Sequence, residues 1–122
     1  MVNWLGGNYN PSSGVISTAG KAFYRQSPGG CYTACAAMIM TNLNATWNGR
    51  TASYWNVYAA NGNSVYLSGS TPGKFGCVRW DIARSKSSVT EAVKKYPQGV
   101  MVAFYQPNKG WNHCMVAVGL NA

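Results

Sequence analysis

Two long apolar runs near the end of the chain predict a β-sheet. They are GVMVAFY (residues 99–105) and HCMVAVGL (residues 113–120), and the loop-forming sequence QPNKGWN (106–112) separates them. Continuous runs of β-forming residues of this length are typical of buried strands. We therefore expect a strand in each run and a loop between the two.

Two segments in the first half of the chain predict helices. Residues 31–42 are rich in Ala, Met and Ile, contain no helix breaker and follow a Gly-Gly pair that marks a helix start. Residues 51–62, TASYWNVYAANG, end in an Asn-Gly pair, which is a common helix stop. The short apolar stretches SVYLSG (64–69) and GCVRWDI (76–82) fit either strands or the edges of loops.

A third helix is predicted directly before the two strands. Ser88-Val-Thr-Glu91 has the capping-box pattern of a helix start, and the helix is expected to run through Tyr96 until Pro97 stops it. Helices come first along the chain and strands last, which indicates an α+β fold. With 122 residues, 47% of them hydrophobic, the chain can form a single globular domain, and such a domain could be excised from a longer protein.

The charge of the chain narrows the range of partners. Ten Lys and Arg residues stand against two acidic residues, which gives a formal net charge of +8. This charge favours anionic partners such as nucleic acid, acidic lipid or cell-wall polymers, although a solvated cationic surface is the simpler interpretation. No nucleic-acid-binding signature accompanies the charge, which argues against nucleic acid. The basic residues form one loose cluster, made of Arg79, Arg84, Lys86, Lys94 and Lys95.

Composition gives a weaker indication of location. The longest apolar run is too short to span a bilayer, and MVNWLGGNYN lacks the basic start and apolar core of a signal peptide. Four cysteines are too few for a disulfide scaffold in a chain of this length. The many Asn, Gly, Ser and Tyr residues fit an exported bacterial or phage-type domain, so we expect a secreted or cell-wall-associated protein.

Candidate chemistry begins at Cys31, within RQSPGGCYTACAAMIM (25–40). The predicted helix starts at this residue, where unsatisfied backbone amides and the helix dipole stabilise a thiolate. A cysteine nucleophile also needs a base and donors for an oxyanion. His113 is the only histidine of the sequence, and the Gln26 side-chain amide could complete an oxyanion hole beside the Cys31 amide. Each residue also has a purely structural interpretation: Cys31 as part of a helix start, His113 as a strand residue and Gln26 as part of a turn.

This arrangement resembles the papain-like cysteine peptidases. Gln26, a helix-opening Cys31 and a distant His113 at the start of an apolar strand occur in the order found in that superfamily. The likeness is greatest to the small bacterial peptidases that process bacteriocin leaders after a double glycine. CYTACAAM (31–38) matches their cysteine, small-residue helix and Ala-Met, but has Tyr-Thr where those peptidases usually have Gly-Pro. Residues 87–120 match their helix, strand and His-led strand.

The resemblance implies a papain-like fold, in which N-terminal helices carrying the cysteine pack on a C-terminal antiparallel sheet carrying the histidine. It implies Cys31 as nucleophile, His113 as general base and Gln26 as oxyanion donor. In the family an Asp or Asn on the strand after the histidine orients the imidazole, and Asn121 is too close along the chain for that role. The alternatives are an orienting residue that has been cut away, another orienting group, or a Cys–His dyad.

The other cysteines have structural interpretations. Cys35 lies one helical turn after Cys31 and is expected to be a buried small residue or to form a disulfide with Cys77. Cys114 alternates with His113 along the predicted strand. We therefore expect the Cys114 side chain to point into the core, on the face of the sheet away from the cleft.

A zinc site is the chemical alternative. It would combine Cys31, Cys35 and Cys77 with His113 or Cys114. Structural zinc sites usually show paired Cys-x-x-Cys knuckles, whereas the spacing here is Cys-x-x-x-Cys with two isolated partners. The His-x-Glu and Pro-Cys-x-x-Cys pattern of nucleobase deaminases is absent from the sequence. We therefore expect neither a metal nor a cofactor.

The sequence thus predicts a thiol hydrolase that cleaves peptide amide bonds through Cys31 and His113. The first alternative is a peptidoglycan-degrading amidase or endopeptidase, because GGCYTACAA followed by TASYWNVYAANG also resembles the cysteine, histidine-dependent amidohydrolase/peptidase domains. The helix directly before a strand favours the peptidase, and the positive charge favours an anionic wall substrate. The second alternative is an inactive papain-like domain that binds a peptide or partner.

Overall fold

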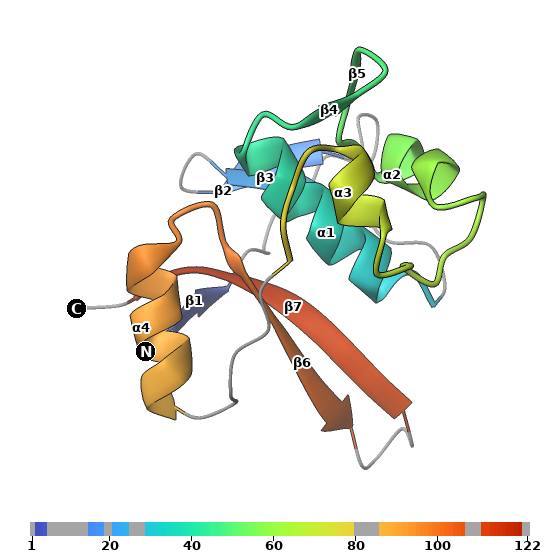
Figure 1. The fold of residues 1–122 in the computed structure, drawn as a ribbon. Helices are drawn as coiled ribbons and strands as arrows, with labels where there is room; N and C mark the ends of the chain where they lie inside the picture. Colours follow the sequence, from blue (N-terminus) through green and yellow to red (C-terminus); the bar gives the residue numbers. More distant parts are fainter. Residues whose placement is uncertain are drawn as a thin grey trace.

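The computed structural model describes part of the chain and shows mixed helix and antiparallel sheet, an α+β fold as predicted (Figure 1). The described residues are 2–4, 15–18, 21–24, 29–79, 86–106 and 111–120. Within these ranges, none of the helices combines the length and the apolar character needed to cross a membrane.

The main sheet consists of three antiparallel strands in the order β1-β7-β6. They are β1 (Val2–Trp4), β6 (Val100–Gln106) and β7 (Trp111–Leu120). The two strands predicted near the end of the chain are confirmed, and β7 begins at Trp111 rather than at His113. The presence of β1 corrects the expectation that helices come first along the chain and strands last.

Strand β7 is covered on both faces. Val116 and Ala117 are neighbours on this strand, so their side chains point to opposite faces of the sheet. Both are buried, with 1% and 0% of their surface exposed. Helices α1 and α4 both contact β7. Around Val116 and Ala117 the strand is therefore buried on both faces, as its apolar run predicts, whereas His113 and Met115 are only partly buried.

Helix α1 (Cys31–Asn42) lies at the centre of the structure, where it contacts β7, β3 and α2 (Figure 1). It confirms the helix predicted over these residues. Eight of its twelve side chains are buried, six of these are small, and Ala37 is fully enclosed. A helix enclosed on most sides carries apolar residues all round rather than along one stripe. Strands β2 (Val15–Thr18) and β3 (Lys21–Tyr24) form an antiparallel hairpin.

The second predicted helix is shorter than its sequence pattern indicates. Helix α2 spans Tyr54–Ala60, because β5 (Arg50–Thr51) pairs with β4 (Thr46–Trp47) in a hairpin. Asn48 and Gly49 form the turn with φ angles of 51° and 76°. Two-residue hairpin turns need this left-handed conformation, which Asn and Gly adopt readily. The predicted stop of α2 at the following Asn-Gly pair is confirmed.

The short apolar stretches 64–69 and 76–82, which fit either strands or loop edges in the sequence, form no strand among the described residues. Residues 64–69 turn irregularly between α2 and the short helix α3 (Thr71–Lys74). Residues 77–79 are also irregular, and the remainder of GCVRWDI from position 80 onward lies outside the described residues.

Asn61 organises the irregular segment after α2. Its Nδ2 donates to the backbone carbonyls of Ser64 (2.9 Å) and Tyr66 (2.6 Å). Its Oδ1 accepts from the Ser68 amide (2.8 Å) and from the hydroxyl of buried Thr71 (2.6 Å). One side chain therefore fixes the path of the backbone between α2 and α3.

This segment in turn holds the first turn of α1. The hydroxyl of fully buried Thr33 donates to the Val65 carbonyl at 2.7 Å. Just before the helix, a Cβ at Gly29 would lie 3.9 Å from both the Val65 and Tyr66 side chains. The position of the helix start therefore depends on the segment that Asn61 orders.

Helix α4 (Lys86–Lys95) precedes β6, as predicted, and ends before Pro97. It begins earlier than predicted, so Ser88 lies inside the helix and the predicted capping box does not mark its start. Glu91 instead lies 3.7 Å from Lys94 in an exposed ion pair. Because both groups are solvated, this pair contributes little to stability.

We expect Asn61→Ala to lower the free energy of unfolding by about 2–4 kcal/mol, because four hydrogen bonds are lost and the hydroxyl of buried Thr71 is left without its acceptor. Urea unfolding of the purified variant measures this loss. The matched control is Asn56→Ala, which removes a single hydrogen bond to the Thr51 carbonyl and should cost about 1 kcal/mol or less. Equal losses in the two variants would contradict the organising role of Asn61.

Candidate active site

Cys31 is the first residue of α1, and this confirms its predicted position at a helix start. The preceding residue, Gly30, provides no side-chain cap, and no acidic residue lies in the first turn. The first intrahelical hydrogen bond runs from the Ala34 amide to the Gly30 carbonyl (2.9 Å), so the earlier amides have no acceptor within the helix. These amides and the helix dipole favour negative charge at this end of α1.

The surroundings of the Cys31 thiol nevertheless favour its protonated form. Its side chain is only 6% exposed. Burial raises the pKa of the thiol above its ordinary value of 9.0, and the neighbouring Cys114 raises it further. Backbone hydrogen bonds from Cys114 and Tyr32 lower the pKa but do not outweigh these effects. The helix start alone therefore does not produce the lowered thiol pKa that the sequence suggests.

Cys114 is the sulfur neighbour of both cysteines on α1. Its Sγ lies 3.3 Å from the Cys35 Sγ, and it also interacts with Cys31. The contact with Cys35, together with burial, raises the pKa of the Cys114 thiol well above its ordinary range. The predicted burial of Cys114 is confirmed, with 2% of its surface exposed. It points into the core, as predicted, but the expected position away from the cleft is wrong, because β7 turns this side chain towards Cys31 and Cys35 of α1.

Of the two alternatives for Cys35, a buried small residue is confirmed, with 2% of its surface exposed, and a disulfide with Cys77 is wrong. Cys35 contacts Cys114, whereas Cys77 lies in the irregular segment after α3, where its thiol donates to the Phe75 carbonyl at 3.8 Å. All four cysteines are present as thiols. Burial raises the pKa of the Cys77 thiol as well.

His113 lies on β7 directly before Cys114 and opposite Phe104 of β6. It is half-buried, and its Nδ1 atom is shielded from solvent. Because side chains alternate along a strand, His113 leaves the backbone on the face opposite to Cys114. The structure brings Cys31 against Cys114, the residue next to His113, while strand alternation directs the side chains of His113 and Cys114 to opposite faces. A direct contact between the Cys31 sulfur and the imidazole stays a prediction.

The remaining predicted site residue falls outside the described part of the chain. Gln26, the expected oxyanion donor, lies in the range 25–28, which precedes the described segment starting at residue 29. Asn121, considered for the orienting position, lies beyond the end of β7 and is also outside the described residues.

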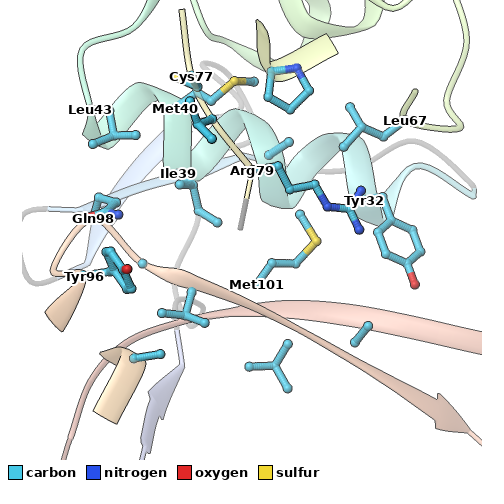
Figure 2. A pocket seen from close by; sticks show the side chains of 18 of the residues that line it. Tyr32, Ile39, Met40, Leu43, Leu67, Cys77, Arg79, Tyr96, Gln98 and Met101 are labelled. Carbon is cyan, nitrogen blue, oxygen red and sulfur yellow. The ribbon is translucent and has the colours of Figure 1, made fainter. Parts of the chain in front are cut away.

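A cavity of about 410 Å³ lies beside α1, between this helix, α4 and β6. Figure 2 shows the Arg79 side chain extending towards Tyr32 at one end of the cavity, with Leu43 towards the other end. Tyr32 directly follows Cys31 in the sequence, but neither Cys31 nor His113 lines the cavity. The cavity therefore adjoins the candidate nucleophile without containing it.

Tyr32 and Arg79 are two polar residues of the cavity lining that sequence reasoning did not assign to this region. Burial raises the pKa of the Tyr32 hydroxyl, and the Arg79 guanidinium counteracts part of this effect. The hydroxyl is therefore a hydrogen-bond donor at neutral pH. Tyr32 stands where the resembled peptidases usually have Gly, and this departure was the only sequence signal for it. Arg79 is visible in the sequence only as one member of the loose basic cluster.

Among the residues described here, no group of three or more His, Cys, Asp or Glu side chains is arranged to hold a metal ion. The zinc alternative needs Cys77 beside the cysteines of α1. The Cys77 thiol instead points to the backbone of its own segment.

Comparisons with protein-family models, curated proteins and solved structures gave no match to this chain. The geometry of α1, β7 and their cysteines is therefore the basis of the functional proposal.

We expect the free energy of unfolding of the reduced protein to fall as pH rises above the ordinary thiol pKa of 9.0. Cys31, Cys77 and Cys114 all have raised pKa values when folded, so the folded state keeps protons that the unfolded chain has lost. Their stabilising effect is fully present below pH 9.0 and declines as pH rises towards the folded-state pKa values. Each such thiol contributes a slope of about −1.4 kcal/mol per pH unit.

Urea unfolding in the presence of a reductant, at several values between about pH 7 and pH 10.5, measures this slope. Other groups titrate in the same range, so the matched comparison is Cys114→Ala, which should show a shallower decline than the wild type. Parallel pH profiles for the two proteins would contradict the raised pKa of Cys114.

Proposed function

We propose that this protein is a thiol hydrolase that cleaves peptide amide bonds, with Cys31 as nucleophile and His113 as general base. The observation that carries the proposal is the packing of the helix-opening Cys31 against β7 at the residue next to His113. Two residues far apart in the sequence, of the types that nucleophilic catalysis needs, are thereby held on two elements in direct contact. The proposal requires the His113 imidazole to turn from its own face of β7 towards the Cys31 sulfur.

The raised pKa of Cys31 determines how the nucleophile would be generated. A thiol with a pKa above 9.0 is almost entirely protonated at neutral pH. The thiol must therefore lose its proton to His113 as it attacks, rather than wait as a resting thiolate. The backbone amides at the start of α1 lie beside the sulfur and would stabilise the oxyanion that develops on the substrate carbonyl.

The complete cycle has two steps. The Cys31 sulfur bonds to the carbonyl carbon of the substrate, the carbon–nitrogen bond breaks, and protonated His113 gives its proton to the departing amine. Water, deprotonated by His113, then hydrolyses the thioester and restores the thiol. A papain-like relationship is part of this proposal, and it is supported by the order of the helix-borne cysteine and the strand-borne histidine.

Peptidoglycan is the second candidate substrate. The net charge of +8 supports it, because bacterial walls carry anionic polymers that would concentrate a cationic hydrolase at their surface. The reaction would be the same amide hydrolysis with the same two residues, so the two candidates differ in substrate and not in mechanism.

We expect Cys31→Ala and His113→Ala each to lower hydrolysis by about a thousandfold or more, because members of one catalytic unit fail together. The measurements use a fluorogenic peptide library and, separately, purified peptidoglycan. Cys77→Ala is the matched control and should keep its activity, because the Cys77 thiol lies in a separate segment. Cleavage of peptidoglycan alone would favour the wall-hydrolase alternative.

Alkylation separates an active site from an inactive binding domain. Iodoacetamide should modify Cys31 in the native protein faster than it does in His113→Ala at about pH 7, because only the wild type offers a base for the thiol proton. Equal rates, together with no cleavage of either substrate, would indicate a domain that binds without hydrolysing.

A further inference from the structure

Two buried sulfur atoms from opposite ends of the chain meet in the core. The Sγ atoms of Cys35 and Cys114 lie 3.3 Å apart, although the two residues are 79 positions apart in the sequence. Both side chains are 2% exposed. Cys35 comes from α1 and Cys114 from β7, so this contact lies in the interface between the central helix and the central strand.

We propose that Cys35 and Cys114 form a disulfide bond when the protein folds in an oxidising environment, and that this bond fastens α1 to β7. A disulfide sulfur–sulfur bond is about 2.05 Å long, so the two atoms need to approach by little more than 1 Å. The bond closes a loop that includes most of the chain, and cross-links of this kind restrict the unfolded state strongly. Secreted and periplasmic proteins meet the required conditions.

The oxidant in this reaction is a small disulfide such as oxidised glutathione. One protein thiolate attacks it, forms a mixed disulfide and releases one molecule of glutathione as a thiol. The second protein thiolate then attacks the protein sulfur of that mixed disulfide and releases the second glutathione. The two cysteines lose two hydrogens in total, and the glutathione disulfide gains them.

The burial of both sulfur atoms determines when the bond between Cys35 and Cys114 can form. In the folded protein the oxidant cannot reach either sulfur directly, and the protonated state of Cys114 slows thiolate attack. The bond therefore forms during folding, before the interface between α1 and β7 closes. Once formed, it is equally protected from reductants, which must wait for local opening of the same interface.

The choice of Cys35 as partner has a consequence for Cys31. Cys114 also interacts with Cys31, so two disulfides compete for one sulfur. A bond to Cys35 occupies Cys114 and leaves Cys31 as the free thiol of the cluster. This consequence rests on the proposed function, in which Cys31 must stay free to act as the nucleophile, whereas the disulfide itself does not depend on it.

The test is to refold the reduced, denatured protein in a glutathione redox buffer and to map its disulfides by mass spectrometry without reduction. We expect one cross-linked species, in which the peptides of Cys35 and Cys114 are joined and two hydrogens are lost. Its thermal unfolding midpoint should fall when dithiothreitol is added. Cys77→Ala, the matched control, should show the same link and the same fall.

Cys35→Ala provides the second measurement. In the described part of the chain, Cys31 is the other cysteine that interacts with Cys114, so oxidative refolding of this variant should link these two. If Cys31 is the nucleophile, that variant should then hydrolyse substrate only after reduction.

Four free thiols in the refolded wild type, or a map that joins Cys31 to Cys114 or Cys35 to Cys77, would overturn the assignment. Loss of the proposed hydrolase function would not affect the map, so the two proposals can fail separately.

Discussion

The close packing of α1 against β7 is the constraint on which the rest of the structure depends. A central helix can approach a central strand this closely only because its contacting side chains are small, as at Ala34 and Cys35. On β7, Cys114 and Val116 lie on one face of the strand and belong to the same core cluster as these α1 residues. Within this interface Cys31 has little freedom, because Thr33 is tied to the Val65 carbonyl one half-turn further along the helix. The candidate nucleophile is therefore placed by the core itself.

That placement has opposing electrostatic effects. The start of a helix favours an anion, but the burial that fixes Cys31 removes the water that would solvate a thiolate. Burial is the larger effect here, and the neighbouring Cys114 thiol adds to it. The helix dipole alone predicts a lowered pKa for the Cys31 thiol, whereas the pKa is raised. In a site of this kind the general base has to deprotonate the thiol during the reaction, because the resting thiol is protonated.

Sequence patterns located the elements with long continuous apolar runs, but they did not predict contacts between residues far apart in the chain. Long apolar runs predict regular elements directly, and they allowed α1, β6 and β7 to be predicted from the sequence. The Asn48-Gly49 pair is a signal for the β4–β5 hairpin, but this hairpin was not predicted. Its strands are so short that the helical pattern after them determined the prediction. The meeting of Cys35 with Cys114 had no local signal, because it depends on which faces of a helix and a strand are turned together. For the same reason the sequence could not separate Cys77 from this cluster.

The pairing of β1 with β7 has a consequence for how the protein folds. Val2 lies opposite Leu120, so the sheet joins residues from the two ends of the chain. During synthesis β1 is made before β7, so this pairing has to wait until β7 has been made. Contacts of such long sequence separation slow folding and leave an early strand exposed to wrong partners. A vectorially synthesised chain with this topology therefore completes the β1–β7 pairing only after synthesis of Leu120.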